Sequence, residues 1–190
     1  MLDYMRGSVV VLDACVLFPA SLRDCLLYAA QADLYQVRWS ELILAEVSKN
    51  LVARAQTTRE KADKLLTTMQ AAFPEAMVNQ RTIIPLIETL TNDPKDRHVL
   101  AAAIVTQAQH IVTVNLTDFP PASLGPYNIT ALSPDEFVSA LYADAPDMMM
   151  EVIRTQSAAL KHPPKSVDEV LATLSQHVPT MVQRLRTMLP

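Results

Sequence analysis

A run of four aliphatic residues, Val9 to Leu12, constrains the fold of this chain more than any other feature. The run has no polar alternation, which indicates a strand buried on both faces, as in the middle of a parallel sheet. Asp13 follows directly, at the strand end where open α/β sheets bind their ligands. Aspartate is also a common turn or helix-cap residue, so this position alone leaves a functional and a structural interpretation open.

The chain has 190 residues, half of them hydrophobic, and a formal net charge of −4. This length suffices for one domain with an extension. No apolar run is long enough to span a membrane, and the N-terminus does not resemble a cleaved signal peptide, so we expect a soluble cytoplasmic protein. Its net charge does not attract nucleic acid, so binding RNA or DNA would need a local basic patch or a bridging metal. Cys15 and Cys25 lack metal-ligand spacing and are expected to be reduced and structural.

Strands and helices alternate along the first three quarters of the chain. Helical spacing and capping residues predict helices at 20–34, 40–56, 58–73, 84–90 and 93–109, and another that opens at Ser133. Strands are predicted at 9–12, 36–39, 77–79, 110–115 and 128–132. A strand, a helix and a return strand form a parallel crossover, so the pattern predicts an α/β domain with a parallel sheet flanked by helices.

The chain changes character from Asp144 onward. Three helical segments separated by prolines follow, without a strand candidate. We therefore predict a domain over residues 1–143 and a helical C-terminal extension over 144–190. The apolar stripes of the extension need a partner surface, which either the first domain or another chain could supply.

Four carboxylates occupy similar places in this predicted fold. Asp13 ends the first strand, Glu46 flanks the apolar stripe of the second helix, Asp96 lies in the first turn of the 93–109 helix, and Asp118 follows the 110–115 strand. Parallel strands would gather them at one edge of the sheet. Each also has a structural interpretation: Asp13 and Asp118 suit turns, Glu46 suits a solvated helix face, and Asp96, at position N3 behind an Asp93 N-cap, suits the helix dipole.

Carboxylates gathered in this way need a cation. Unit charges about 4 Å apart repel by about 4 kcal/mol at an effective dielectric near 20, which would raise their pKa values. Oxygen ligands without cysteine or histidine at ligand spacing favour Mg²⁺ or Mn²⁺ over zinc. Such a metal activates water and offsets charge on the oxygens of a phosphodiester, so the set is suited to hydrolysing that bond.

Four segments follow one another along the chain: VVVLDACVLFP, ILAEV, DPKDRHVLAAAI and IVTVNLTDFP. In this order they resemble the PIN domain, the ribonuclease fold of the VapC toxins in bacterial toxin–antitoxin pairs, and the resemblance covers residues 8 to about 142. It implies a parallel sheet flanked by helices, an acidic Mg²⁺ or Mn²⁺ site, and cleavage of RNA, often transfer RNA. It also implies an antitoxin protein as partner and a homodimer. The helical tail resembles that of a longer VapC-like subgroup.

The resemblance assigns roles residue by residue. Asp13, Glu46, Asp96 and Asp118 match the family's acidic positions and are the predicted catalytic residues and metal ligands. Asn115 matches a polar residue that accompanies the last aspartate, and Asp93 is expected to support the set as the N-cap of its helix. The RNA backbone contacts are assigned to nearby basic residues, which are Arg23, Lys95 and Arg97.

The sequence departs from the family pattern after the first aspartate. Many members carry a hydroxyl residue and then asparagine or serine there, whereas Ala14 and Cys15 stand at these positions. A hydrogen bond that supports Asp13 is therefore either missing or supplied by another residue.

The sequence thus predicts a metal-dependent endoribonuclease, the toxin of a type II toxin–antitoxin system. The alternative is a non-catalytic PIN-like module that binds a protein, which the acidic net charge and the apolar tail favour. A second alternative is an acidic metal hydrolase that acts on DNA or small phosphate esters. A nucleotide-dependent enzyme is disfavoured, because neither Gly7 nor Gly125 lies in a phosphate-binding loop pattern.

Overall fold

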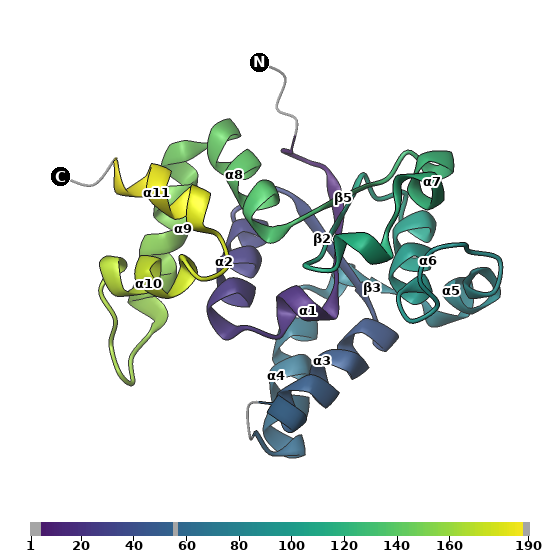
Figure 1. Cartoon of the computed structure of the whole chain (residues 1–190). Helices are drawn as coiled ribbons and strands as arrows, with labels where there is room; N and C mark the ends of the chain where they lie inside the picture. The colour runs from purple at the N-terminus through teal and green to yellow at the C-terminus, as the bar shows by residue number, and fades with distance from the viewer. Residues whose placement is uncertain (1–4, 55–56, 188–190) are drawn as a thin grey trace.

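The computed structural model describes residues 5–54 and 57–187, which are built around one parallel five-stranded sheet (Figure 1). The strand order is β3-β2-β1-β4-β5. The strands are β1 (Val9–Leu12), β2 (Gln36–Ser40), β3 (Met77–Val78), β4 (His110–Val112) and β5 (Thr130–Leu132). The predicted α/β class with a parallel sheet is confirmed.

The aliphatic run that follows Ser8 forms the central strand. In β1, Val10, Val11 and Leu12 are fully buried. Val10 pairs with Val37 of β2 on one side and with His110 of β4 on the other. The chain therefore leaves β1 toward β2 and returns to the other side of β1 as β4, which makes the gap between β1 and β4 the switch point of the sheet.

Helices connect and flank the strands. Those up to the end of the predicted first domain are α1 (Ala14–Leu17), α2 (Ala20–Gln31), α3 (Glu41–Arg54), α4 (Arg59–Ala72), α5 (Gln80–Ile87), α6 (Arg97–Val105), α7 (Pro121–Leu124) and α8 (Pro134–Asp144). Short 3₁₀ helices occur at η1 (Pro74–Ala76), η2 (Leu116–Asp118) and η3 (Gly125–Tyr127). No helix in the described ranges is both long and apolar enough to cross a membrane.

Three predicted helices and one predicted strand differ from the structure. Helix α2 ends at Gln31 rather than 34, and β4 ends at Val112 rather than 115. The predicted 93–109 helix is wrong at both ends, because α6 begins at Arg97 and ends at Val105. Pro94 disfavours helical backbone at Asp93, and the Asp93 side chain closes a turn by accepting a hydrogen bond from the backbone N–H of Lys95 at 3.0 Å. Helix α5 begins at Gln80 rather than 84, because Asn79 caps it through the N–H of Arg81 at 3.0 Å.

The C-terminal extension forms the three predicted helices, α9 (Pro146–Ala159), α10 (Val167–Leu174) and α11 (Pro179–Arg186). Figure 1 shows them gathered beside α2, away from α5, α6 and α7. Gln156 of α9 is buried and donates through Nε2 to the Ser21 carbonyl oxygen of α2 at 2.9 Å. The apolar stripe of α10 is also buried within the chain, so part of the surface that the extension needs is supplied in cis.

The boundary predicted between residues 143 and 144 falls at the end of α8. Residues 1–4, 55–56 and 188–190 of the two predicted ranges lie outside the described residues, and so does the end of the helix predicted at 40–56. The division into two domains stays a prediction.

The start of α11 is capped by a side chain from α8, which yields a stability prediction. The Asp135 carboxylate accepts hydrogen bonds from the N–H groups of Thr180 at 3.0 Å and Met181 at 3.3 Å. Asp135→Ala should lower the free energy of unfolding by about 1 kcal/mol, because the first turn of α11 loses its acceptor. Asp135→Asn retains an acceptor oxygen and should lose less. Urea unfolding of the three proteins checks this, and equal stabilities would contradict the capping role.

Candidate functional site

Asp13 lies at the carboxyl end of β1, beside the end of β4. Its side chain is buried, with a residue exposure of 2%. Its backbone N–H donates to the Val112 carbonyl oxygen at 3.1 Å, which holds the two strand ends together. Asp13 occupies the N-cap position of α1 but its side chain makes no capping hydrogen bond. The structural interpretation as a helix cap therefore does not account for this buried carboxylate.

Two donors hold one oxygen of the Asp13 carboxylate. Oδ2 accepts from the Thr113 hydroxyl at 2.7 Å and from the Cys15 thiol at 3.0 Å. The Cys15 sulfur in turn accepts from the Val114 N–H at 3.3 Å, and the Thr113 oxygen accepts from the Asn115 N–H at 3.0 Å. The sequence did not show whether any residue donates a supporting hydrogen bond to Asp13. In the structure, Cys15 and Thr113 both do.

Asp96 is the N-cap residue of α6 but its side chain makes no capping hydrogen bond. The residue is 8% exposed. The prediction that Asp93 caps this helix is wrong, since Asp93 closes the preceding turn and its carbonyl oxygen accepts from the Asp96 N–H at 3.0 Å. The helix-dipole explanation for an N3 carboxylate therefore does not apply to Asp96, which is the residue before the first helical turn.

The pKa of Asp96 reports the proximity of the other three carboxylates. Burial and the charge of Asp13 are the largest causes that raise this pKa to about 7, followed by the charge of Asp118, a hydrogen bond to Asp118 and the charge of Glu46. When it is protonated, the Asp96 carboxyl can donate this hydrogen bond to Asp118. The fold therefore brings Asp13, Glu46 and Asp118 close enough to Asp96 for their charges to act on it.

The four carboxylates are nevertheless not at ligand spacing. Among residues 5–54 and 57–187, no group of three or more His, Cys, Asp or Glu side chains is arranged so that it could hold a metal ion. The four carboxylates are therefore close enough to influence one another electrostatically, as the sequence predicts. They are not arranged closely enough to bind one metal ion together.

Asp118 and Glu46 border the two buried aspartates. Asp118 ends η2, is half-buried, and accepts through its backbone carbonyl from the Asp93 N–H at 3.2 Å. The Glu46 side chain, on α3, is 43% exposed, and its Oε2 lies 3.7 Å from Nε2 of His98. Asn115 is exposed and starts η2 without a side-chain cap. Asp93 and Asn115 therefore adjoin the site through backbone contacts.

A family model described as the PIN domain matches residues 9–117, more than half of the chain. This chain belongs to the PIN domain family. A second model, described as the VapC50 C-terminal domain, matches residues 134–187. A relative named "Putative ribonuclease VapC50", from Mycobacterium tuberculosis (strain ATCC 25618 / H37Rv), is 40% identical over 108 residues, which cover 55% of this chain and 62% of that protein. No solved structure matches the chain significantly.

These matches confirm the resemblance drawn from the sequence, namely a VapC-like PIN protein with a C-terminal extension. The match spans 62% of the relative's length, which is less than two thirds.

The predicted RNA-contact residues of this PIN domain differ in accessibility. Arg23 is 7% exposed and donates through Nη1 to the Leu17 carbonyl oxygen at 3.1 Å. Burial lowers the pKa of Arg23. Lys95 is exposed beside Asp96, and Arg97 is half-buried and donates through Nε to the Asn92 carbonyl oxygen at 3.3 Å. An RNA contact stays a prediction for all three, and Lys95 is the one whose side chain is open to solvent.

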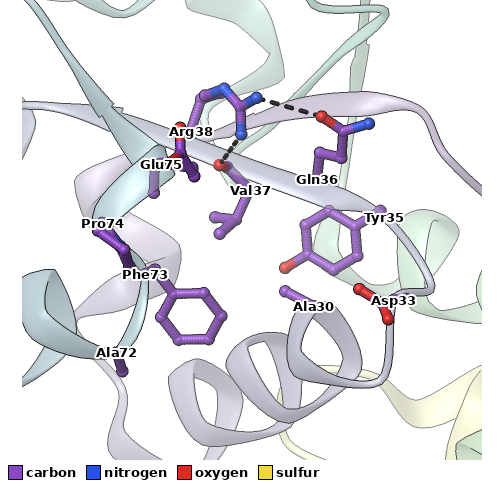
Figure 2. Close-up of a pocket in the computed structure, with 11 residues that line it drawn as sticks. Ala30, Asp33, Tyr35, Gln36, Val37, Arg38, Ala72, Phe73, Pro74 and Glu75 are labelled. Atoms are coloured by element: carbon purple, nitrogen blue, oxygen red, sulfur yellow. Dashed lines mark hydrogen bonds between the residues drawn. The ribbon is translucent and has the colours of Figure 1, made fainter.

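A separate groove lies along β2. Its volume is about 430 Å³. Figure 2 shows the residues that line it, which come from β2, the end of α4 and η1, with Tyr35 and Phe73 among them. Arg38 folds along its own strand there and donates to the Val37 carbonyl oxygen at 2.8 Å. None of the four carboxylates lines this groove, so it is distinct from the candidate site.

Sequence reasoning missed the roles of Thr113 and His98. Thr113 directly follows β4, so the parallel pairing of β4 with β1 would have placed it beside Asp13 had the strand been predicted to end at Val112. His98 is packed in the structure, with a side-chain exposure of 14%. Its proximity to Glu46 depends on how α3 packs against α6, for which the sequence carries no signal.

The raised pKa of Asp96 predicts a pH-dependent stability. Its ordinary pKa is 3.8 and its folded value is about 7. Between these values the native carboxyl holds a proton that the unfolded one has released, so raising the pH favours unfolding. The stability of the metal-free protein relative to Asp96→Asn should therefore fall as the pH rises from about 4 to about 7. Chemical denaturation at a series of pH values measures this difference, and a difference independent of pH would contradict the assignment.

Both cysteines should be unreactive in the folded protein. Burial is the largest cause that raises the pKa of each thiol, Cys15 and Cys25, to about 12. At about pH 8 only about one thiol in ten thousand would be ionised, and the thiolate is the nucleophile. Titration with a thiol-specific reagent should label neither cysteine in the native protein and both in denaturant. Rapid native labelling of Cys15 would show that its hydrogen bond to Asp13 is not maintained.

Proposed function

We propose that this PIN protein is a metal-dependent endoribonuclease and the toxin of a type II toxin–antitoxin system. The observation that carries this proposal is the Asp96 carboxyl, which is buried at the switch point of a parallel sheet beside three other carboxylates and has a pKa of about 7. Open α/β sheets bind ligands at this place. A cluster of carboxylates that retains a proton near neutral pH is a site in which a cation can replace that proton.

The donor set fits a hard divalent cation. Asp13, Glu46, Asp96 and Asp118 offer oxygen ligands, which Mg²⁺ and Mn²⁺ prefer. When bound, such an ion supplies an activated water and offsets negative charge on the phosphodiester. Thr113 and Cys15 hold Oδ2 of Asp13, which leaves Oδ1 as its free oxygen. Glu46 is partly exposed on α3, so its side chain has room to move toward the other three.

Basic side chains would hold the RNA backbone beside these carboxylates. Lys95 is exposed in the turn that leads to Asp96 and is the first candidate for a phosphate contact. Arg97 follows Asp96 and is half-buried. Arg23 would reach RNA only if its hydrogen bond to the Leu17 carbonyl were exchanged.

Family membership and the name of the relative support the biological setting. The proposed substrate is RNA, often transfer RNA in this family, and the proposed partners are an antitoxin protein and a second copy of the chain. The proposed location is the cytoplasm. The relative's name contains the word ribonuclease, which favours RNA over DNA as the substrate.

One observation favours a second candidate function, a non-catalytic module that binds a protein. In the part of the chain that the structure describes, the acidic residues do not form a metal-binding group. A module of this kind would keep the PIN fold and the buried carboxylates but would have no specific affinity for Mg²⁺ or Mn²⁺.

A cleavage assay with a matched pair of variants tests the proposal. The purified protein should cut single-stranded or transfer RNA in the presence of Mg²⁺ or Mn²⁺, and Asp13→Asn should reduce the rate by at least about 100-fold because it removes a charge from the site. Asp33→Asn makes the same chemical change at an exposed position and should leave the rate unchanged. Both variants should retain the wild-type melting temperature within a few degrees.

Two outcomes would decide against the proposal. Full activity of Asp13→Asn would show that the carboxylate site does not perform the reaction. Absence of metal-dependent cleavage in the wild type, together with tight binding of a protein partner, would favour the non-catalytic module. A substrate with 2′-deoxyribose at every position separates an RNA enzyme from one that also accepts DNA.

A further inference from the structure

We propose that His98 is a positioning residue for Glu46, and this inference rests on the proposed function. His98 lies in the first turn of α6, two residues after Asp96. Its Nε2 atom is buried and has no hydrogen-bond partner. Buried polar atoms are nearly always paired in native proteins, so this nitrogen calls for a hydrogen-bond partner.

The candidate partner is the Glu46 carboxylate. Its Oε2 lies 3.7 Å from His98 Nε2, which is beyond hydrogen-bond distance by less than about 1 Å. Within the described ranges, the Glu46 side chain has no hydrogen bond and no other ion pair. A carboxylate repels the lone pair of a bare imidazole nitrogen and attracts an N–H, so this contact favours a proton on Nε2.

The proposed role follows from how differently the carboxylates are held. Asp13 is fixed by two donors and Asp96 has a hydrogen bond to Asp118, whereas the half-exposed Glu46 has only the 3.7 Å contact with His98 among the described residues. Glu46 is therefore the carboxylate with the most freedom to move toward a cation bound among them. The His98 Nε2–H would then donate to Oε2 and leave the other oxygen of Glu46 free to act as a ligand.

Manganese binding to the full chain tests this role through substitutions that keep or remove the donor. His98→Leu should weaken Mn²⁺ binding by about 10-fold, because residues that orient metal ligands typically contribute 10- to 100-fold. His98→Gln places an amide N–H near the position of Nε2 and should restore most of the affinity. His177→Leu, in the C-terminal extension, is the matched control and should bind as the wild type does.

A double variant separates positioning from a general effect on folding. In the Glu46→Gln background, His98→Leu should cause little further loss, because the residue acts through Glu46. An equal loss in both backgrounds, or wild-type affinity in His98→Leu, would overturn the inference while leaving the metal site intact. Absence of saturable Mn²⁺ binding in the wild type would overturn the metal site and this inference together.

Nuclear magnetic resonance of the wild-type imidazole gives a second test that needs no substitution. The ¹⁵N shifts of His98 should show the tautomer protonated at Nε2, and addition of Mg²⁺ should shift this N–H downfield as the hydrogen bond shortens. The tautomer protonated at Nδ1, or an Nε2–H signal that Mg²⁺ leaves unchanged, would overturn the proposed role.

Discussion

The parallel pairing of β1 with β4 decides where the chemistry of this chain can lie. Because both strands run in the same direction, Asp13 and the residues that follow Val112 leave the sheet at one edge. The bond from the Asp13 N–H to the Val112 carbonyl locks these strand ends together. Asp96 approaches this edge from the start of α6 and meets the other carboxylates there, and their charges and its burial keep its proton near neutral pH. The strand order and direction thus decide where the site lies, and the side chains decide which chemistry it can perform.

The carboxylates differ in how firmly they are held, and this difference reconciles two observations. Their charges are close enough to raise the pKa of Asp96, yet they are not arranged as metal ligands. Asp13 is held by Thr113 and Cys15, while Glu46 remains half-exposed on α3. A cation bound among these carboxylates would offset the repulsion between their charges.

Much of the fold could be predicted from the sequence because its signals are local. The aliphatic run of β1 and the capping residues Ser40, Thr58 and Ser133 mark elements whose identity does not depend on distant partners. The predicted helix at 93–109 was wrong because Asp93 and Pro94 suit both a helix start and a turn, and only tertiary packing separates the two.

The candidate site could be predicted in part. The gathering of the four carboxylates could be anticipated from topology, whereas the Thr113 hydrogen bond to Asp13 and the approach of His98 to Glu46 depend on where a strand ends and how two helices pack. The role of Cys15 was invisible because a thiol replaces the hydroxyl or amide that the family pattern leads one to expect.

We propose that a divalent cation displaces the proton that the Asp96 carboxyl holds near neutral pH. Calorimetric titration of the metal-free protein with Mn²⁺ at about pH 7, in two buffers of different ionisation enthalpy, measures the bound ions and the released protons together. We expect saturable binding with release of a fraction of a proton per ion, and loss of that release in Asp96→Asn. Absence of saturable binding, or binding without proton release that Asp96→Asn leaves unchanged, would contradict it.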